Sequence, residues 1–246
     1  MRHVRRSFLG GVVLSLLACA APQRPRSTPP SRPIARRPPP KALPKAAPDD
    51  GLHLKGGLGT LDQSTVEERL KEHQQEFVEC FQRGLRESAY LGGAVTFKLR
   101  VGPAGAVKSV LLSESTLGSR PVEQCLLGVV STLVFPRPKG GDAEFTYPLS
   151  FPSREQILIW DPGMVQKELK RQRRMLLARA RGAGALALPK GLMLTFYVDR
   201  RGRAVSAGLA APTPFAEDLA ERLLQNLKKL KFIAPQGSLA KVTYRW

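Results

Sequence analysis

The stretch that decides the fold is GGAVTFKLRVGPAGAVKSVLLSES, residues 92–115. Its apolar residues Val95, Phe97, Leu99 and Val101 alternate with polar ones, which is typical of a strand with one buried face. The glycines and proline of GPAG, residues 102–105, then favour a turn into a second strand over 106–113. The sequence therefore predicts a β-hairpin with one face on a core.

Helical patterns flank this hairpin. Residues Ser64 to Glu67 form a capping box, and apolar residues recur at helical spacing after it, which predicts a helix over 64–88. Pro121 suits the first turn of a second helix. The stretch GGDAEFTYPLSF, residues 140–151, predicts a closing strand.

The same order of elements returns in the rest of the chain. Residues 161–181 read as a helix, LMLTFYVDRRGRAVSAGLA (192–210) as a hairpin, 215–232 as a helix and 239–246 as a strand. Phe135 precedes FTY by the same ten residues that separate Phe232 from VTY. The chain is thus expected to be α+β, with two tandem modules, each a helix, hairpin, helix and strand. Their two sheets could pack together or pair edge to edge.

The amino terminus resembles a bacterial lipoprotein signal. Three arginines precede an apolar run that is too short for a membrane span, and Leu16-Leu17-Ala18-Cys19 resembles a lipobox. The resemblance implies a signal peptide over 1–18 and a mature chain that begins at lipidated Cys19. The alternative is an ordinary secretory signal that happens to contain a cysteine.

A proline-rich stretch follows the signal. Residues 20–50 hold ten prolines and seven basic residues, a composition too poor in apolar surface to fold. We expect residues 19–50 to be a disordered, semi-rigid linker. A functional alternative is that its Arg-Pro run binds a ligand or an anionic surface.

The chain is strongly basic. Its formal charge is +19, and removal of Arg2, Arg5 and Arg6 with the signal leaves 36 basic and 20 acidic residues, or +16. This excess predicts attraction to polyanions such as anionic lipid, peptidoglycan or acidic polysaccharide. Export argues against intracellular nucleic acid as a partner.

Residues 58–151 resemble a known family. The motifs that carry the resemblance are VECFQRGL (78–85), GGAVTFKLRVGPAGAVKSVLLSESTLGSRPVEQC (92–125) and VFPRPKGGDAEFTYPLSF (134–151). They resemble the AgmX/PglI C-terminal domain of myxobacterial envelope proteins, itself similar to the C-terminal domain of TonB. The expected domains are an AgmX/PglI-like module over 51–152 and a divergent TonB-C-like module over 153–246.

The resemblance implies a non-catalytic protein-interaction adaptor of the cell envelope. TonB-like domains receive a partner's extended segment by strand addition at a sheet edge. The resemblance also implies a link to gliding motility or envelope assembly. With Ala20 after the lipidated cysteine, we expect a lipid anchor on the periplasmic side of the outer membrane. The alternative function is a basic structural lipoprotein that binds peptidoglycan or another envelope polyanion.

Two cysteines remain once Cys19 is lipidated. Cys80 and Cys125 lie on the apolar faces of their predicted helices, and an oxidising compartment favours a disulfide between them. The alternative is two separate buried thiols.

A second candidate site is a basic helix. Its charged residues are Lys167, Lys170, Arg171, Arg173, Arg174, Arg179 and Arg181, and Val165, Leu169, Leu176 and Ala180 mark its buried side. The charges could contact anionic lipid or cell-wall polymer, or they could simply be solvated.

Catalytic chemistry has little support in the sequence. Only three histidines occur, no cluster has metal-ligand spacing, and Ser113 to Ser115 lack a histidine in a recognisable motif. We expect no enzyme activity, no metal and no cofactor.

Overall fold

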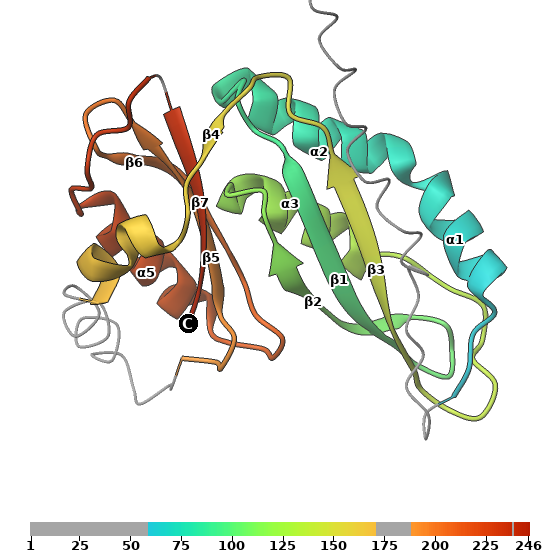
Figure 1. The fold of residues 1–246 in the computed structure, drawn as a ribbon. Helices are drawn as coiled ribbons and strands as arrows, with labels where there is room; N and C mark the ends of the chain where they lie inside the picture. The colour runs from blue at the N-terminus through green and yellow to red at the C-terminus, as the bar shows by residue number, and fades with distance from the viewer. Residues whose placement is uncertain (1–58, 171–187, 238) are drawn as a thin grey trace, which may run out of the picture. The chain divides into compact units, whose positions relative to one another are not determined.

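The computed structural model describes residues 59–170, 188–237 and 239–246, all of which belong to one compact unit, Pro48–Trp246. The predicted signal peptide and Pro-rich linker lie outside the described residues. The described part is a mixed α+β protein with two sheets and helices packed against them (Figure 1). We call residues 59–152 the first half and residues 153–246 the second half.

The first half has a three-stranded antiparallel sheet in the order β2-β1-β3. In the central strand, Phe97 lies opposite Leu112 of β2 and Tyr147 of β3. The elements are α1 (Gln63–Glu72), α2 (Gln74–Glu87), β1 (Gly93–Val101), β2 (Val107–Ser115), α3 (Arg120–Ser131) and β3 (Ala143–Phe151).

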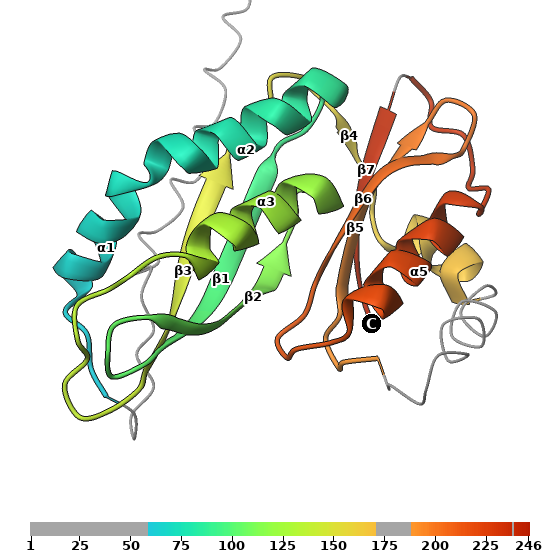
Figure 2. The ribbon, with the colours of Figure 1, turned by 180° about the vertical axis from the view of Figure 1, so that it is seen from behind.

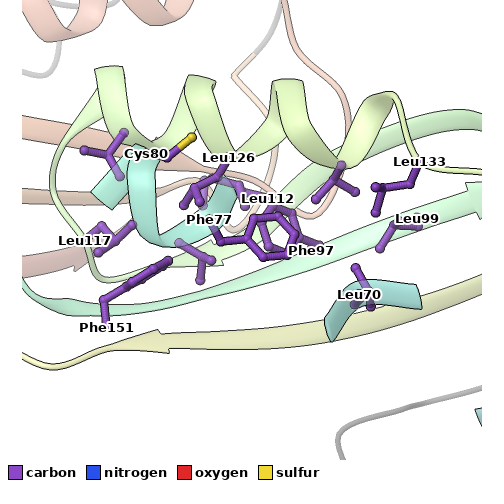
Figure 3. Close-up of a cluster of buried hydrophobic side chains, with 14 of the residues drawn as sticks. Leu70, Phe77, Cys80, Phe97, Leu99, Leu112, Leu117, Leu126, Leu133 and Phe151 are labelled. Carbon is purple, nitrogen blue, oxygen red and sulfur yellow. The ribbon is translucent and has the colours of Figure 1, made fainter. Parts of the chain in front are cut away.

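The three helices cover one face of this sheet, as both views show (Figures 1 and 2). The alternating apolar residues of β1 point to that face and are buried, as the sequence predicted. Figure 3 shows Phe77, Phe97 and Leu126 gathered between the helices and the sheet, with the Phe77 and Phe97 ring centroids 6.3 Å apart. The other face carries polar residues such as Lys98 and Arg100.

The predicted helix over 64–88 is wrong in two details. It is divided at His73, whose N–H bonds to the Leu70 carbonyl while its own carbonyl accepts from Phe77 N–H, so His73 ends α1 and begins α2. The N-cap is Asp62 and not Ser64, because the Asp62 carboxylate accepts the Thr65 N–H at 3.3 Å. Both helices still bury their apolar stripes.

The second half has a four-stranded sheet in the order β4-β7-β5-β6. The strand β4 was not predicted, since it has only two residues and pairs parallel with β7. Residues 163–170 are helical, and the remainder of the predicted basic helix lies outside the described residues. The other elements are β4 (Leu158–Ile159), β5 (Met193–Asp199), β6 (Ala204–Ala210), α5 (Glu217–Lys228) and β7 (Leu239–Arg245).

The second sheet is covered on both faces. Leu194, Phe196 and Val198 of β5 join the core beneath α5, while Met193 and Tyr197 join the core of the first half. Six of the seven β5 residues are therefore buried. The first half therefore packs against one face of the second sheet. One backbone hydrogen bond also links β2 to the end of β6, from the Ala211 N–H to the Leu112 carbonyl at 2.8 Å.

Candidate binding site at the outer edge of the first sheet

The strand β3 lies at the edge of its sheet, and within the described ranges its outer side is paired only at its start. Gly59 N–H donates to the Asp142 carbonyl at 2.6 Å, and Gly59 forms a parallel bridge with Ala143. Among the described residues, no further backbone hydrogen bond reaches the outer side of residues 145–151. Main-chain groups along most of this edge therefore have no partner in the part of the chain that the structure describes.

The direction of those groups follows from strand alternation. Because the Asp142 carbonyl points outward, the even-numbered residues of the strand turn their backbone groups to the outer edge. Thr146 and Ser150 then offer both an N–H and a carbonyl, and Pro148 offers only a carbonyl. Proline is tolerated there because the β1 ladder uses the odd-numbered residues.

A hollow of about 360 Å³ lies between α2 and the carboxyl end of β3. Its apolar wall comes from both elements, and polar residues such as Gln82 and Arg154 border it. The apolar lining residues are Phe77, Val78, Phe81, Leu85, Leu149 and Phe151. An open strand edge beside an apolar groove suits an extended polypeptide, whose backbone would pair with β3 and whose side chains would enter the groove.

The corresponding edge of the second sheet is partly occupied by the chain itself. Leu158 and Ile159 of β4 pair with Ala240 and Lys241 of β7, and Trp160 N–H donates to the Lys241 carbonyl at 2.9 Å. This edge has a strand added from its own chain, whereas the outer side of β3 has one bridging residue, Gly59, among the residues that the structure describes.

A disulfide joins the two cysteines that the sequence analysis paired. Cys80 of α2 and Cys125 of α3 are bonded, with their Cα atoms 5.7 Å apart. The bond ties the helix that lines the groove to its neighbour. The residues of the groove itself were not singled out from the sequence, because an ordinary apolar helix face does not reveal that part of it remains uncovered.

The predicted basic helix is seen only in part. Lys167 and Lys170 are exposed, and Val165 and Leu169 are buried, in agreement with the predicted buried side. Five arginines that were predicted to bind polyanions lie outside the described residues: Arg171, Arg173, Arg174, Arg179 and Arg181. Leu176 and Ala180, which were predicted for the buried side, also lie outside them. Cys19 also lies outside the described residues.

A buried polar network at the junction of the halves was missed by sequence reasoning. Glu123 of α3 is fully buried and accepts from Ser115 Oγ at 2.6 Å and from the Leu209 N–H of β6 at 2.9 Å. Burial raises the pKa of Glu123 to about 7, although the hydrogen bonds from Ser115 and Leu209 act to lower it. Gly208 permits this contact, because a Cβ there would meet the Glu123 carboxylate at 2.1 Å. The network joins the halves and occupies part of the β6 edge.

The polar residues of 113–115 have structural partners. Ser115 bonds to Glu123, and Glu114 forms an ion pair with Arg245 at 3.0 Å. Within the described ranges, no group of three or more His, Cys, Asp or Glu side chains is placed to hold a metal. No helix in that part of the chain is long and apolar enough to cross a membrane.

Comparisons with known proteins return no matching family model, no matching curated protein and no matching solved structure.

Proposed function

We propose that this protein is a lipid-anchored adaptor of the cell envelope, built from two tandem TonB-C-like modules, that binds an extended segment of a partner protein along the outer edge of β3. The observation that carries this proposal is the open β3 edge beside the apolar groove of α2. Strand addition needs main-chain donors and acceptors rather than particular side chains, so it leaves little sequence signature. No catalytic step is part of this function.

The tandem modules are supported by equivalent positions at constant spacing. Up to the hairpins the equivalents lie 99 residues apart. Asp62 and Asp161 both accept a backbone N–H at the start of a helix. The pairs that follow them, Val66 with Val165 and Leu70 with Leu169, are all buried.

After the hairpin turns, the equivalents lie 97 residues apart. Phe135 N–H donates to the Gly105 carbonyl at 2.8 Å, and Phe232 N–H donates to the Gly202 carbonyl at 2.7 Å. Both glycines have positive φ, 87° and 72°. The sheet orders β2-β1-β3 and β6-β5-β7 also correspond. Two copies of one ancestral module account for these shared details.

The envelope setting rests on the amino-terminal signal, the lipobox at Cys19 and the Pro-rich linker. Fully extended, about 30 residues at roughly 3.1 Å each would reach on the order of 90 Å. The disulfide is consistent with an oxidising compartment. We propose the periplasmic side of the outer membrane. Energy transduction is not part of the proposal, since TonB receives energy through an uncleaved membrane helix and a lipid anchor replaces it here.

The strand-addition proposal is tested with displayed peptides. A library of random peptides is selected against the full-length chain, and bound peptides are measured again against two variants at one position. Thr146→Pro removes an outward N–H and leaves the β1 ladder intact, whereas Thr146→Val changes the side chain and keeps the N–H. We expect binding to survive Thr146→Val and to fall at least about 10-fold with Thr146→Pro, the value of one main-chain hydrogen bond.

Two further measurements make the test decisive. N-methylation of successive amides in a selected peptide should weaken binding at every second position, because alternate residues face β3. Val78→Asp should weaken peptides with an apolar residue directed at the groove. Equal binding to the Thr146→Pro and Thr146→Val variants, both shown to be folded by circular dichroism, would rule out the β3 edge.

The anchor is tested separately by metabolic labelling with radioactive palmitate in a Gram-negative host. Label should be incorporated into the natural chain and lost in Cys19→Ala. Fractionation of envelope membranes should then place the labelled protein with the outer membrane. A chain that takes up no label would show that the leader is an ordinary secretory signal.

A further inference from the structure

Six basic residues from two separate segments meet at one end of the second half. The turn between β5 and β6 and the segment after α5 are joined by the Phe232 N–H, which donates to the Gly202 carbonyl at 2.7 Å, and by a bridge between Arg203 and Lys231. We call the group the basic tip: Arg200, Arg201, Arg203, Lys228, Lys229 and Lys231. All six are exposed.

The charge of the basic tip is largely uncompensated. In the described part of the chain, Asp199 is the only acidic residue ion-paired with the tip, and it pairs with Arg203 at 2.9 Å. The same carboxylate accepts the Arg201 and Arg203 backbone N–H groups at 2.9 Å each, so it also shapes the turn. Five cations remain without an acidic partner among the described residues.

Exposed apolar side chains adjoin these cations. Ile233 follows the Phe232 that anchors the turn and is 71% exposed, and Val205 is 40% exposed two residues after Arg203. Basic residues next to protruding apolar ones are typical of surfaces that lie on anionic membranes, where the cations meet phosphates and the apolar groups enter the acyl boundary. A hydrated carboxylate polymer, by contrast, would have no apolar region for the Ile233 side chain to enter.

The first half shows that the fold does not require these charges. At the equivalent positions, 97 residues earlier, the same turn and helix end carry only neutral residues. They are Pro103, Ala104, Ala106, Ser131, Thr132 and Val134. Pro136 stands where the second half has Ile233. The scaffold is shared, and basic residues at these six positions occur in the second half and not in the first.

We propose that the basic tip is a binding site for an anionic membrane surface, recognised through the phosphates of its lipid headgroups, with Ile233 at the acyl boundary. The arginines suit phosphate oxygens because their guanidinium groups donate in pairs. This site is separate from the β3 edge, so either function could hold without the other.

The test uses a local probe on the full-length chain with Cys19→Ala. An environment-sensitive fluorophore is attached to Ile233→Cys or, as the matched control, to the equivalent Pro136→Cys, while Cys80 and Cys125 remain bonded to each other. Vesicles rich in phosphatidylglycerol should shift the emission of the probe at 233 to the blue and leave the probe at 136 unchanged. Neutral phosphatidylcholine vesicles and high salt should abolish the shift.

Two charge variants complete the design. Replacement of Arg200, Arg201, Lys228, Lys229 and Lys231 by glutamine should lower the apparent affinity for anionic vesicles by about 100-fold or more. The same replacement of five exposed residues of the first half, Lys71, Arg83, Arg86, Arg137 and Lys139, should change it less than about 5-fold. Equal losses in the two variants, or equal shifts at both probes, would overturn the proposal. So would a shift caused by isolated peptidoglycan but not by vesicles.

Discussion

The two halves share a strand order but differ in what covers their sheets. The second face of the first sheet carries polar residues such as Lys98 and Arg100, whereas the second face of the second sheet is buried against the first half. The Tyr197 hydroxyl and the Lys241 ammonium both donate to the Gly92 carbonyl across this contact, at 3.2 and 2.6 Å. The comparison teaches that sheets with corresponding strand orders can differ in role: the first sheet has an exposed polar face, and the second is covered on both faces.

The candidate binding surfaces also differ between the two halves. The open edge and groove belong to the first half, and the basic tip belongs to the second. The two halves thus present two distinct surfaces, because they differ in the residues outside their cores.

The largest expected effect tests whether the halves unfold together. Phe97→Ala and Phe196→Ala each remove a fully buried ring, from equivalent positions of the two cores, and should each cost about 3–5 kcal/mol. Trp160 and Trp246, the only tryptophans, both report on the second half. Because the first half buries a face of the second sheet, Phe97→Ala should lower the urea midpoint measured by tryptophan fluorescence as well as by circular dichroism. An unchanged fluorescence midpoint would mean that the halves unfold independently.

The disulfide closes a loop within the first half. Cys80 and Cys125 are 45 residues apart, and closing such a loop stabilises by roughly 4 kcal/mol in the chain-entropy model. The double variant Cys80→Ala, Cys125→Ala should lose up to that amount in urea unfolding. Reductant should destabilise the natural chain to the same level and leave the variant unchanged, and a reductant effect on the variant would contradict this assignment.

The junction should make stability depend on pH. The pKa of Glu123 is raised by burial from its ordinary value of 4.5 to about 7 in the folded protein. Between these two pH values the folded state therefore binds more protons than the unfolded state. Stability should therefore fall as pH rises from about 4.5 to about 7, by on the order of 3 kcal/mol. Glu123→Gln should flatten this dependence in urea unfolding at a series of pH values. A slope that persists in the variant would assign the effect to other groups.

The smallest expected effect concerns an exposed contact between the halves. Arg245 and Glu114 form an ion pair at 3.0 Å, with side chains 57% and 52% exposed. Such pairs contribute about 0.5 kcal/mol or less because water screens them. A double-mutant cycle with Arg245→Ala and Glu114→Ala measures it, and a coupling above about 1 kcal/mol would show that the junction is less solvated than the exposures indicate.

Local patterns predicted most of the elements. The hairpins were predictable because period-two alternation in β1 and turn glycines mark them directly. The division at His73 was not, since the apolar stripe continues through it at helical spacing. The strand β4 was missed because two residues carry no periodicity.

The binding surfaces were predicted less well. Glu123 looks like an ordinary helix residue, and only the approach of Leu209 and Ser115 makes it a buried junction group. The basic tip was missed because Arg200 and Lys231 are distant in sequence.

The sequence by itself determined the α+β class, the repeated order of elements, the cysteine pair and the strong positive charge, because these follow from composition and local periodicity. Only the tertiary structure decided which sheet edge stays open, which sheet face is covered and where the basic residues gather. Those properties depend on contacts between residues far apart in the chain, and such contacts leave no local pattern.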